Sequence, residues 1–436
     1  MARAREDDRE ILRLAVPAFL ALVAEPLFLL ADTAIVGHLG TTPLAGLGIA
    51  GAILSTLISL CIFLAYGTTA SVARRIGAGD LRGALTQGID GVWLAIAIGL
   101  VTTAAGVPMT PWLVGLFGPS AGVAGEAETY LRIGLFGAVP LLVMLATTGI
   151  LRGLLDTRTP LYVAVGGNLA NVVLNVWLVY GLDLGIAGSA LGTVLAQAAS
   201  ALVLLTVVVR AARTHGATLR PSIVGVRGAG SAAVPLLLRT LTLRVSLLVM
   251  TYGATTLGEA DLATMQIAMT LWTFLAFALD AIAIAAQALT GRYLGAGDRD
   301  GTRTITARML RWGVVSGIVT GILLAASSPF LGPLFTGDDQ VHDLLVPVLL
   351  VAALAQPLAG VVFVLDGVLI GAGDGRYLAW AGLVVLVGFA PAAWLAVSVG
   401  GTLVWLWLAF GVAFMGGRGV VLLARAAGDD WMRLGA

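Results

Sequence analysis

The sequence predicts an all-α polytopic membrane protein in which twelve transmembrane helices form two homologous six-helix bundles. Of its 436 residues, 59% are hydrophobic and 11% are charged, whereas a soluble domain carries about 25% charged residues. Apolar stretches long enough to cross a bilayer recur along the whole chain. A pattern of glycines and charged residues in the first half also returns in the second half at a constant offset.

Apolar stretches of about 20 residues mark the expected membrane spans. They fall at 11–37, 45–71, 85–107, 129–151, 160–181, 186–209, 230–256, 262–288, 307–331, 344–370, 377–398 and 402–424. The first stretch follows a basic tail without a small-residue cleavage site, so we expect it to be retained as a helix. Cys61 is the one cysteine, which excludes a disulfide and a cysteine-based metal site.

The placement of arginine predicts the orientation of the spans, because all 25 basic residues are arginine. They occupy the N-terminal tail, the start of the first span and every second loop: Arg3, Arg5, Arg9 and Arg13; Arg74, Arg75 and Arg82; Arg152 and Arg158; Arg210, Arg213, Arg220 and Arg227; Arg292, Arg299, Arg303, Arg308 and Arg311; Arg376; Arg418, Arg425 and Arg433. Only Arg132, Arg239 and Arg244 fall outside this pattern. By the positive-inside rule, both termini are expected in the cytoplasm and the number of spans is even.

The chain contains an internal repeat with an offset of 218 residues, which is half its length. The stretch "RRIGAGDLRG" (74–83) recurs as "RYLGAGDRDG" (292–301), and "GILRGLLDTR" (149–158) recurs as "GVLIGAGDGR" (367–376). We therefore expect an N-terminal six-helix lobe over 1–215 and a C-terminal six-helix lobe over 216–436. With six spans each, both lobes enter the membrane in the same sense, as in the parallel repeats of some secondary transporters.

The two-lobe repeat favours a transporter with its substrate in a cleft between the lobes. The chain has no G-x-x-x-x-G-K-[ST] motif and no lysine, so an ion gradient is a better candidate energy source than ATP. A membrane-embedded enzyme would need a metal or an acid/base cluster, but the three histidines lie at loops or span ends and no H-E-x-x-H motif occurs. A channel is disfavoured because single, unrepeated acids suit alternating access better than a symmetric pore.

Two carboxylates, Glu25 and Asp32, lie within the first span. An ionised residue at mid-membrane costs roughly 2.5–3.5 kcal/mol on insertion scales, so each is expected to face a cavity or a partner. They are seven residues apart, which is about two helical turns or roughly 10 Å. Either could couple transport by binding a proton, or could be the static partner of a buried arginine. Asp32 aligns with Met250 in the repeat, so this acid belongs to the N-terminal lobe alone.

Polar residues also recur in the fifth and sixth spans. Asn168, Asn171 and Asn175 are spaced at about one turn, and Thr193 follows in the sixth span. The amides are suited to binding a carboxylate, a cation or a substrate, but equally to hydrogen bonding between helices. Thr193 could face the same cavity, although a threonine that bonds its own helix is commoner.

The C-terminal lobe carries its own intramembrane charges. Asp280 and Asp366 are the acids, and Arg239 and Arg244 are their expected counter-charges with a structural role. Pro17, which the repeat aligns with Pro235, can bend its helix. Such a bend could serve gating or could only shape the lobe.

The stretches "PLFLLADTAIVGHLG", the two "GAGD" loops, "GNLANVVLNVW" and "FVLDGVLIGAGD" together resemble the multidrug and toxic compound extrusion (MATE) family, and its DinF-like branch in particular. The resemblance covers essentially all twelve spans. It implies two six-helix lobes in a V-shaped arrangement and alternating access. It also implies antiport of organic, often cationic, compounds against H+ or Na+.

The resemblance assigns roles to particular residues. It makes Asp32 the coupling acid and Pro17 the bend, and it places Asn171, Asn175 and Thr193 at the cavity, where we add Asn168 and Met250 as candidates. Some relatives have an aspartate at the position of Asn175. The amide here removes a carboxylate pair, and no acid lies within the seventh span to accompany Asp366 in a Na+ site. H+ is therefore favoured over Na+.

Two alternatives stay open, a Na+-coupled antiporter and a flippase for a lipid-linked precursor. The flippase predicts a strongly cationic cleft, for which Arg239 and Arg244 are the obvious candidates. We expect no enzymatic activity, no cofactor other than the coupling ion, no metal site and no nucleic-acid partner. The expected protein is a monomer in the plasma membrane, and its partners are the bilayer and organic, in part cationic, substrates.

Overall fold

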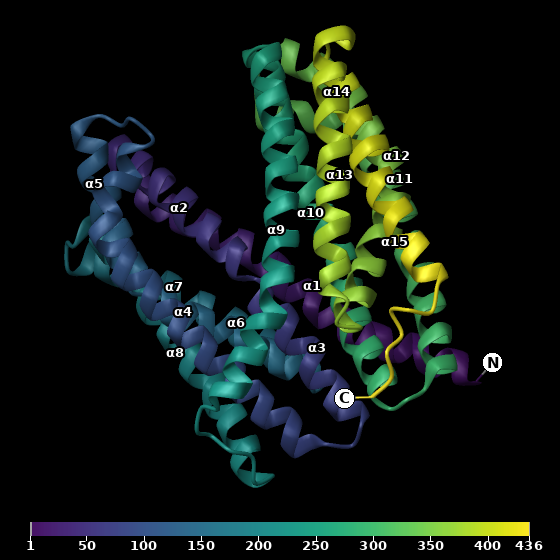
Figure 1. Cartoon of the computed structure of the whole chain (residues 1–436). Coiled ribbons are helices and arrows are strands. Elements are labelled where there is room, and N and C mark those ends of the chain that lie inside the picture. The colour runs from purple at the N-terminus through teal and green to yellow at the C-terminus, as the bar shows by residue number, and fades with distance from the viewer. Residues whose placement is uncertain (1, 436) are drawn as a thin grey trace. The chain divides into compact units, whose positions relative to one another are not determined.

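The computed structural model describes the backbone of residues 2–435 and the side chains of residues 6–435. Nearly all of this part is helical, and it contains no β-strand (Figure 1). The first half contains α1 (Ala2–Gly37), α2 (Thr41–Cys61), α3 (Phe63–Gly77), α4 (Leu81–Gly115), α5 (Ala121–Leu135), α6 (Ala138–Gly153), α7 (Arg158–Val176), the π-helical segment η1 (Trp177–Gly181) and α8 (Gly185–Thr214). The second half contains α9 (Ile223–Leu257), α10 (Glu259–Gly295), α11 (Arg299–Phe335), α12 (Asp339–Gly371), α13 (Gly375–Leu395), η2 (Ala396–Gly400), α14 (Leu403–Ala409), η3 (Phe410–Gly416) and α15 (Gly417–Ala427).

Each of the twelve predicted spans falls on helical residues, in several cases on two or three consecutive segments. Within residues 2–435, eleven segments are long and apolar enough to cross a membrane. The one remaining span, the fourth in chain order, corresponds to α5 and α6 together, and these two helices are bent by 49° at the short break between them. The prediction of twelve spans is therefore confirmed, because a bilayer sets the length of its helices and apolar length can be read directly from sequence.

The repeat is seen in the backbone conformation of the turns between helices as well as in the amino-acid sequence. Gly79 and Gly297 both have a left-handed backbone, with φ of 77° and 73°. Asp80 and Asp298 follow them, and each side chain accepts a 2.7 Å hydrogen bond from the backbone N–H three residues later. The "GAGD" motif thus ends one helix with a glycine and caps the next with an aspartate.

The described residues divide into two compact units. One unit comprises Leu20–Ala233, and the other comprises the segment ending at Phe19 together with the chain from Val234 onward. The predicted lobes over 1–215 and 216–436 describe the sequence repeat, whereas this division groups the start of α1 with the second half of the chain. The helix itself continues without a break through Pro17.

Each unit has its own apolar core. In the first unit, the core includes Val36, Leu47 and Leu131, contributed by α1, α2 and α5. In the second unit, aromatic rings of α10, α13, α14 and η3 pack edge to face or stacked, among them Trp272, Trp407 and Phe410. Such clusters, together with the close approach of glycines, provide the packing that helices need where lipid offers no hydrophobic driving force.

The beginning of α1 is fixed within the second unit by polar contacts. Glu10 accepts two hydrogen bonds from the guanidinium of Arg292, at 2.7 and 2.9 Å. Asp7 accepts one from Arg308 at 3.2 Å, and the indole N–H of Trp312 donates to Asp8 at 2.9 Å. The acidic stretch from Asp7 to Glu10, which the sequence alone suggests is a free tail, is therefore bound to α10 and α11.

Candidate functional site

The carboxylate of Asp32 is the centre of a buried polar network in the first unit. Only 7% of this residue is exposed. Its Oδ1 accepts hydrogen bonds from Nδ2 of Asn175 and Oγ of Ser189, both at 2.7 Å. Its Oδ2 accepts a longer hydrogen bond, at 3.4 Å, from the hydroxyl of Tyr130. Four segments, α1, α5, α7 and α8, thus converge on one carboxylate.

Two glycines of α8 allow this convergence, because they let α8 approach the fifth span closely. A Cβ on Gly188 would lie 2.8 Å from the backbone carbonyl carbon of Leu178. A Cβ on Gly192 would overlap the side-chain oxygen of Asn175. Small residues at such positions let helix backbones come together and place Ser189 within reach of Asp32.

A chain of amides leads away from Asp32 along α7. The two N–H groups of the Asn175 amide are divided between Asp32 and Oδ1 of Asn171, the latter at 3.1 Å. Nδ2 of Asn171 in turn donates to Oγ1 of Thr193 at 2.9 Å. The Oδ1 atom of Asn175 is buried and has no hydrogen-bond partner among the described residues. An unfilled buried acceptor is costly, so this site has an oxygen available for a further donor.

The C-terminal end of α1 is held by the π-helical segment that follows α7. The hydroxyl of Tyr180 in η1 donates to the backbone oxygen of Ile35 at 2.5 Å. The last carbonyls of a helix have no partner within the helix, and this contact satisfies one of them a single turn beyond Asp32. A π-helical segment, η2, occupies almost the same place in the second repeat.

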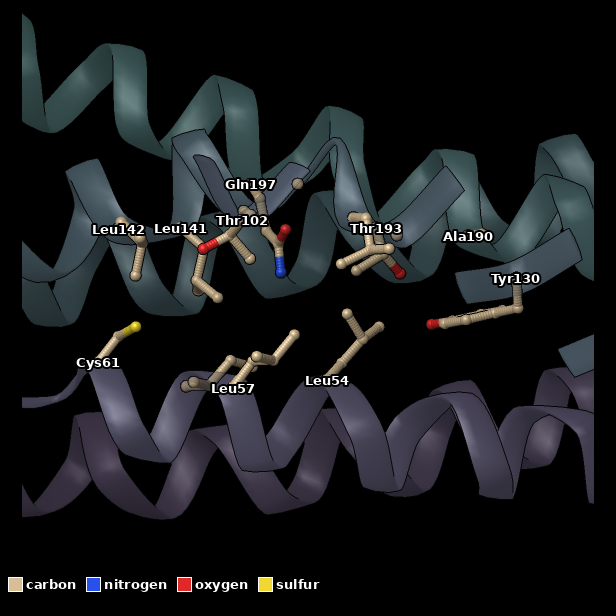
Figure 2. A pocket seen from close by; sticks show the side chains of 15 residues that line it. Leu54, Leu57, Cys61, Thr102, Tyr130, Leu141, Leu142, Ala190, Thr193 and Gln197 are labelled. Atoms are coloured by element: carbon tan, nitrogen blue, oxygen red, sulfur yellow. The ribbon is translucent and has the colours of Figure 1, made fainter. Parts of the chain in front are cut away.

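A small cavity lies beside this network. Figure 2 shows Leu54, Leu57 and Cys61 of α2 on one side of it, with Thr193 and Gln197 of α8 on the other. The remaining lining residues are Ile58, Thr102, Tyr130, Gly134, Leu135, Gly137, Ala138, Leu141, Leu142 and Ala190. The cavity has a volume of about 50 Å³, which is room for a few water molecules.

The cavity is connected to Asp32 by two side chains that belong to both. The hydroxyl of Tyr130 contacts the carboxylate directly, and Thr193 ends the amide chain. No charged side chain lines the cavity, whose walls are mostly aliphatic with a few hydroxyl and amide groups. Such a composition is typical of sites for small organic molecules.

The other predicted residues of the first half lie outside this network. Glu25 is exposed on α1 and forms no hydrogen bond or salt bridge with the side chains that the structure describes. Asn168 is half-buried on α7, one turn before Asn171, and it joins none of the hydrogen bonds around Asp32. Glu25 and Asp32 lie on the same helix, as their spacing predicted, but they share no hydrogen-bond partner.

A second buried carboxylate, Asp366 of α12, has entirely different neighbours. Its Oδ1 accepts a hydrogen bond from Nε of Arg239 at 3.0 Å, and its Oδ2 contacts the Nη2 atoms of Arg239 and Arg418. All three residues are less than a tenth exposed. Asp366 is therefore the shared partner of two guanidinium groups.

Sequence reasoning placed Arg239 opposite the acids of its lobe but missed Arg418. That arginine was grouped with the basic residues near the end of the chain, whereas it lies buried in α15 with its guanidinium also over the ring of Phe414. Arg244 is exposed on α9 and Asp280 is half-buried on α10. Met250, the repeat counterpart of Asp32, is fully buried in the second unit.

The described residues contain no cluster of three or more histidine, cysteine or carboxylate side chains that could hold a metal ion. The Asp32 network instead offers a single carboxylate surrounded by neutral hydroxyl and amide groups. Such a centre is suited to exchanging a small ion or a proton, and the cavity beside it has a lining like that of small-molecule sites but, in this structure, holds only a few water molecules.

Comparison with known proteins agrees with this architecture. The sequence matches the MatE family over residues 17–177 and again over 235–395, and the second match begins and ends 218 residues after the first. It is 32% identical over 404 residues to the Arabidopsis thaliana protein DETOXIFICATION 44, chloroplastic, covering 89% of this chain and 76% of that protein. It is 30% identical over 434 residues to the DNA damage-inducible protein F of Escherichia coli, covering 97% and 93%.

The fold is also that of solved MATE structures. A structure of a variant of the Vibrio cholerae MATE transporter VcmN superposes with a TM-score of 0.91, at 18% sequence identity, over 99% of this chain and 100% of that one. The duplicated family match has the same 218-residue offset as the repeat in the sequence. The matches to the two relatives also cover most of the length of each relative. The chain therefore belongs to the MatE family of polytopic membrane transporters, as its resemblance to DinF-like members predicted.

Proposed function

We propose that this chain is a secondary active antiporter that exports organic compounds by alternating access, with Asp32 as the site that binds and releases the coupling proton. The observation that carries this proposal is the contrast between two buried carboxylates, Asp32 and Asp366. Asp366 lies between two guanidinium groups. Asp32 accepts hydrogen bonds only from neutral groups and forms no salt bridge with any residue whose side chain is described.

This contrast separates a structural acid from an exchangeable one. Protonating Asp366 would leave two buried cations without their anion, which is strongly unfavourable. Protonating Asp32 breaks no ion pair and removes an isolated charge from the membrane interior. Of these two carboxylates, Asp32 is therefore the one that can change its charge during a transport cycle.

Protonation of Asp32 would also change the direction of the neighbouring hydrogen bonds. An ionised carboxylate only accepts, whereas a protonated one also donates through its O–H. If the side-chain amide of Asn175 rotates by half a turn, its unfilled Oδ1 can accept a hydrogen bond from that O–H. Asn175 would then present a different group to Asn171, and Asn171 to Thr193 at the cavity. The charge of Asp32 is thereby linked to the hydrogen-bonding character of the cavity wall.

The same geometry supports H+ over Na+ as the coupling ion. A Na+ site is favoured by several oxygen acceptors, as hard cations prefer carboxylate and carbonyl ligands. Around Asp32 the hydroxyl and amide groups donate toward its carboxylate, and the network contains no second carboxylate. The cavity without charged walls supports an organic substrate over the lipid-linked precursor of a flippase.

The proposal includes a location and an orientation. The arginine-rich tail and alternate loops support a plasma-membrane protein with both termini in the cytoplasm, acting as a monomer. Labelling Pro119→Cys and Asp183→Cys, each in a Cys61→Ala background, with a membrane-impermeant maleimide in intact cells tests this orientation. Both should react from outside, whereas His215→Cys in the same background should react only after permeabilisation.

The coupling role is tested with the purified chain in proteoliposomes. Uptake of a fluorescent organic cation would be driven by a pH gradient or, separately, by a Na+ gradient. Asp32→Asn is expected to abolish the response to the pH gradient, and Thr33→Val is the matched control because the Thr33 hydroxyl contacts only its own helix at Leu29. A full response of Asp32→Asn to the pH gradient would refute the role, and a response of wild type to Na+ alone would assign the other ion.

A further inference from the structure

The fourth span is broken beside the cavity of the first unit. Its two halves, α5 and α6, are bent by 49° at Phe136 and Gly137. The backbone N–H groups of these two residues donate three residues back, to the carbonyls of Ile133 and Gly134, whereas an α-helix pairs each N–H four residues back. Gly134, Gly137 and Ala138 all line the cavity, so both sides of the break belong to its wall.

The broken span is supported by a polar side chain of a neighbouring helix. Pro140 has no N–H, so it cannot pair with the carbonyl of Phe136 four residues earlier. The carbonyl oxygen of Leu135 accepts a 2.8 Å hydrogen bond from Oγ1 of Thr103 on α4. Threonine side chains that satisfy freed backbone groups are one reason why broken helices are tolerated within membranes. Thr103 therefore stabilises the break from outside the span.

The second repeat has the same span without a break. The repeat offset of 218 residues also holds in the backbone at the end of this span, where Leu155 and Gly373 are both left-handed, with φ of 63° and 74°. Residues 136–137 align with residues 354–355, and α12 is continuous there although Pro357 lies within it. A proline alone therefore does not break this span, and the glycine at the break is part of its cause.

The helix that packs against the break differs between the repeats in a matching way. Thr103 aligns with Gly321, and Leu135 aligns with Ala353. A Cβ on Gly321 would lie 2.6 Å from the carbonyl oxygen of Ala353, so α11 packs directly against this carbonyl. In the first unit, the equivalent carbonyl accepts the hydroxyl of Thr103. The first unit thus has a support for a broken span where the second unit has close packing of a continuous helix.

The repeat position of Leu54, a cavity-lining residue of α2, holds a bulky ring in the second unit. Leu54 aligns with Trp272, which is 5% exposed. The Trp272 ring packs edge to face on the rings of Trp407 and Phe410, with centroids 6.1 and 5.2 Å away. The broken span and the aliphatic cavity wall therefore occur together in the first unit, and both are replaced in the second.

We propose that the break at Phe136 and Gly137 is a hinge, supported by Thr103, at which the first unit opens the cavity beside Asp32 to an organic ligand. The cavity has a volume of about 50 Å³, whereas sites for drug-sized molecules have about 300–1,000 Å³. Such a ligand can enter only if the wall moves, and hinges are residues at the ends of elements that absorb a change in backbone angles. This inference rests on the organic substrate of the proposed function but not on the coupling role of Asp32.

A cysteine on the cavity wall can measure the opening. Ala190 lines the cavity (Figure 2) and is fully buried, so Ala190→Cys in a Cys61→Ala background should react with N-ethylmaleimide only while the cavity is open. We call this protein the parent. When opening and closing are fast compared with the reaction, the labelling rate follows the population of the open state. Mass spectrometry of the purified full-length protein in detergent measures this rate without any ion gradient.

Two changes at the hinge should move the labelling rate in opposite directions. Gly137→Ala/Pro140→Leu introduces the residues of the second repeat and should make the span continuous, so we expect labelling to slow by about tenfold. Thr103→Val removes the hydrogen bond to the carbonyl of Leu135 and weakens the closed state. We expect it to speed labelling about two- to tenfold, the effect of one hydrogen bond.

Each change has a matched control on a helix of the same unit. Gly115→Ala/Pro111→Leu on α4 repeats the glycine and proline replacements, and Thr206→Val on α8 removes a hydroxyl that donates to Leu202 of its own helix. None of these positions lines the cavity, so both controls should label like the parent. Equal labelling of the parent and both hinge variants would overturn the hinge. Thermal unfolding shows whether each variant is folded, and Pro140→Leu alone replaces the double variant if that one does not fold.

Ethidium, a fluorescent organic cation, tests what enters the open cavity. It should protect the parent from N-ethylmaleimide, and Leu54→Trp, which places the ring of the second repeat in the cavity, should weaken ethidium binding about tenfold. Fluorescence anisotropy measures that binding. An unchanged labelling rate of the parent in saturating ethidium would overturn the entry of an organic cation at this hinge. The pH-gradient assay of Asp32→Asn decides the coupling role separately.

Discussion

Asn175 donates a 2.7 Å hydrogen bond to Asp32, although 143 residues separate them in the chain. The amide is fully buried and the carboxylate nearly so, so neither can satisfy its hydrogen bonds with water. Through its second N–H, Asn175 also continues to Asn171 and Thr193. A change in the charge of Asp32 therefore has a defined route to the cavity, which the first two substitutions below test together with the packing around it.

The first prediction concerns the middle of the amide chain. Asn171→Val removes the link between Asn175 and Thr193 but leaves the direct partners of Asp32 in place. We expect pH-driven transport to fall about two- to tenfold, the effect of one lost hydrogen bond, with little change in the amount of folded protein. Asn168→Val on the same helix is the control and should transport like wild type. Equal loss in both variants would contradict the route.

The second prediction concerns the close approach of α8 to the fifth span. Gly192→Ala introduces a Cβ that overlaps the Asn175 side chain, and such overpacking typically costs about 1–3 kcal/mol. The thermal unfolding midpoint should fall and transport should weaken with it. Gly166→Ala, where a Cβ meets nothing within 4 Å, should leave the midpoint unchanged or raise it. An unaltered midpoint for Gly192→Ala would show that α8 can move aside.

The third prediction concerns the buried triad of the second unit. Asp366→Asn leaves Arg239 and Arg418 without their shared anion, and breaking such a buried pair costs about 3–5 kcal/mol. We expect a large fall in unfolding free energy, measured by denaturant titration in detergent. Asp300→Asn is the control, since the Asp300 side chain is 96% exposed and surface changes stay within about 0.5 kcal/mol. Comparable stability of the two variants would contradict the pairing.

The fourth prediction concerns the start of α1. Glu10→Gln weakens the two-fold contact with Arg292, whose side chain is about a quarter exposed. We expect a loss of about 1 kcal/mol or less at low salt, and a smaller loss in high salt because ions screen exposed charges. Thermal unfolding at two salt concentrations measures this difference. Glu6→Gln serves as control, because Glu6 is exposed and forms no salt bridge with the described side chains.

The spans and the repeat could be predicted from sequence because both depend on local features. Apolar length identifies a membrane helix regardless of its neighbours. The glycine and aspartate of each "GAGD" motif act within one turn, where Gly79 and Gly297 need a left-handed backbone. The importance of Asp32 was also predictable, since a carboxylate in an apolar run requires a reason.

The partners of Asp32 were only partly predictable. Asn171, Asn175 and Thr193 stood out as polar groups in apolar spans, but Ser189 and Tyr130 did not, since serine and tyrosine are common near helix ends. Their contacts depend on how α5 and α8 pack against α1, which no local pattern specifies. Arg418 was missed for the same reason, because only the packing of α12 and α15 shows that it is buried beside Asp366.

The binding of the first residues to the second unit has a consequence for biosynthesis. Glu10 meets Arg292, and Asp7 meets Arg308, across separations of 282 and 301 residues. At a synthesis rate of about 5–20 residues per second, the first turns of α1 wait for roughly 15–60 s before α10 and α11 exist. During that interval the acidic stretch has no arginine of α10 or α11 to bind. A segment synthesised well before α10 and α11 is thus among the last to reach its final contacts.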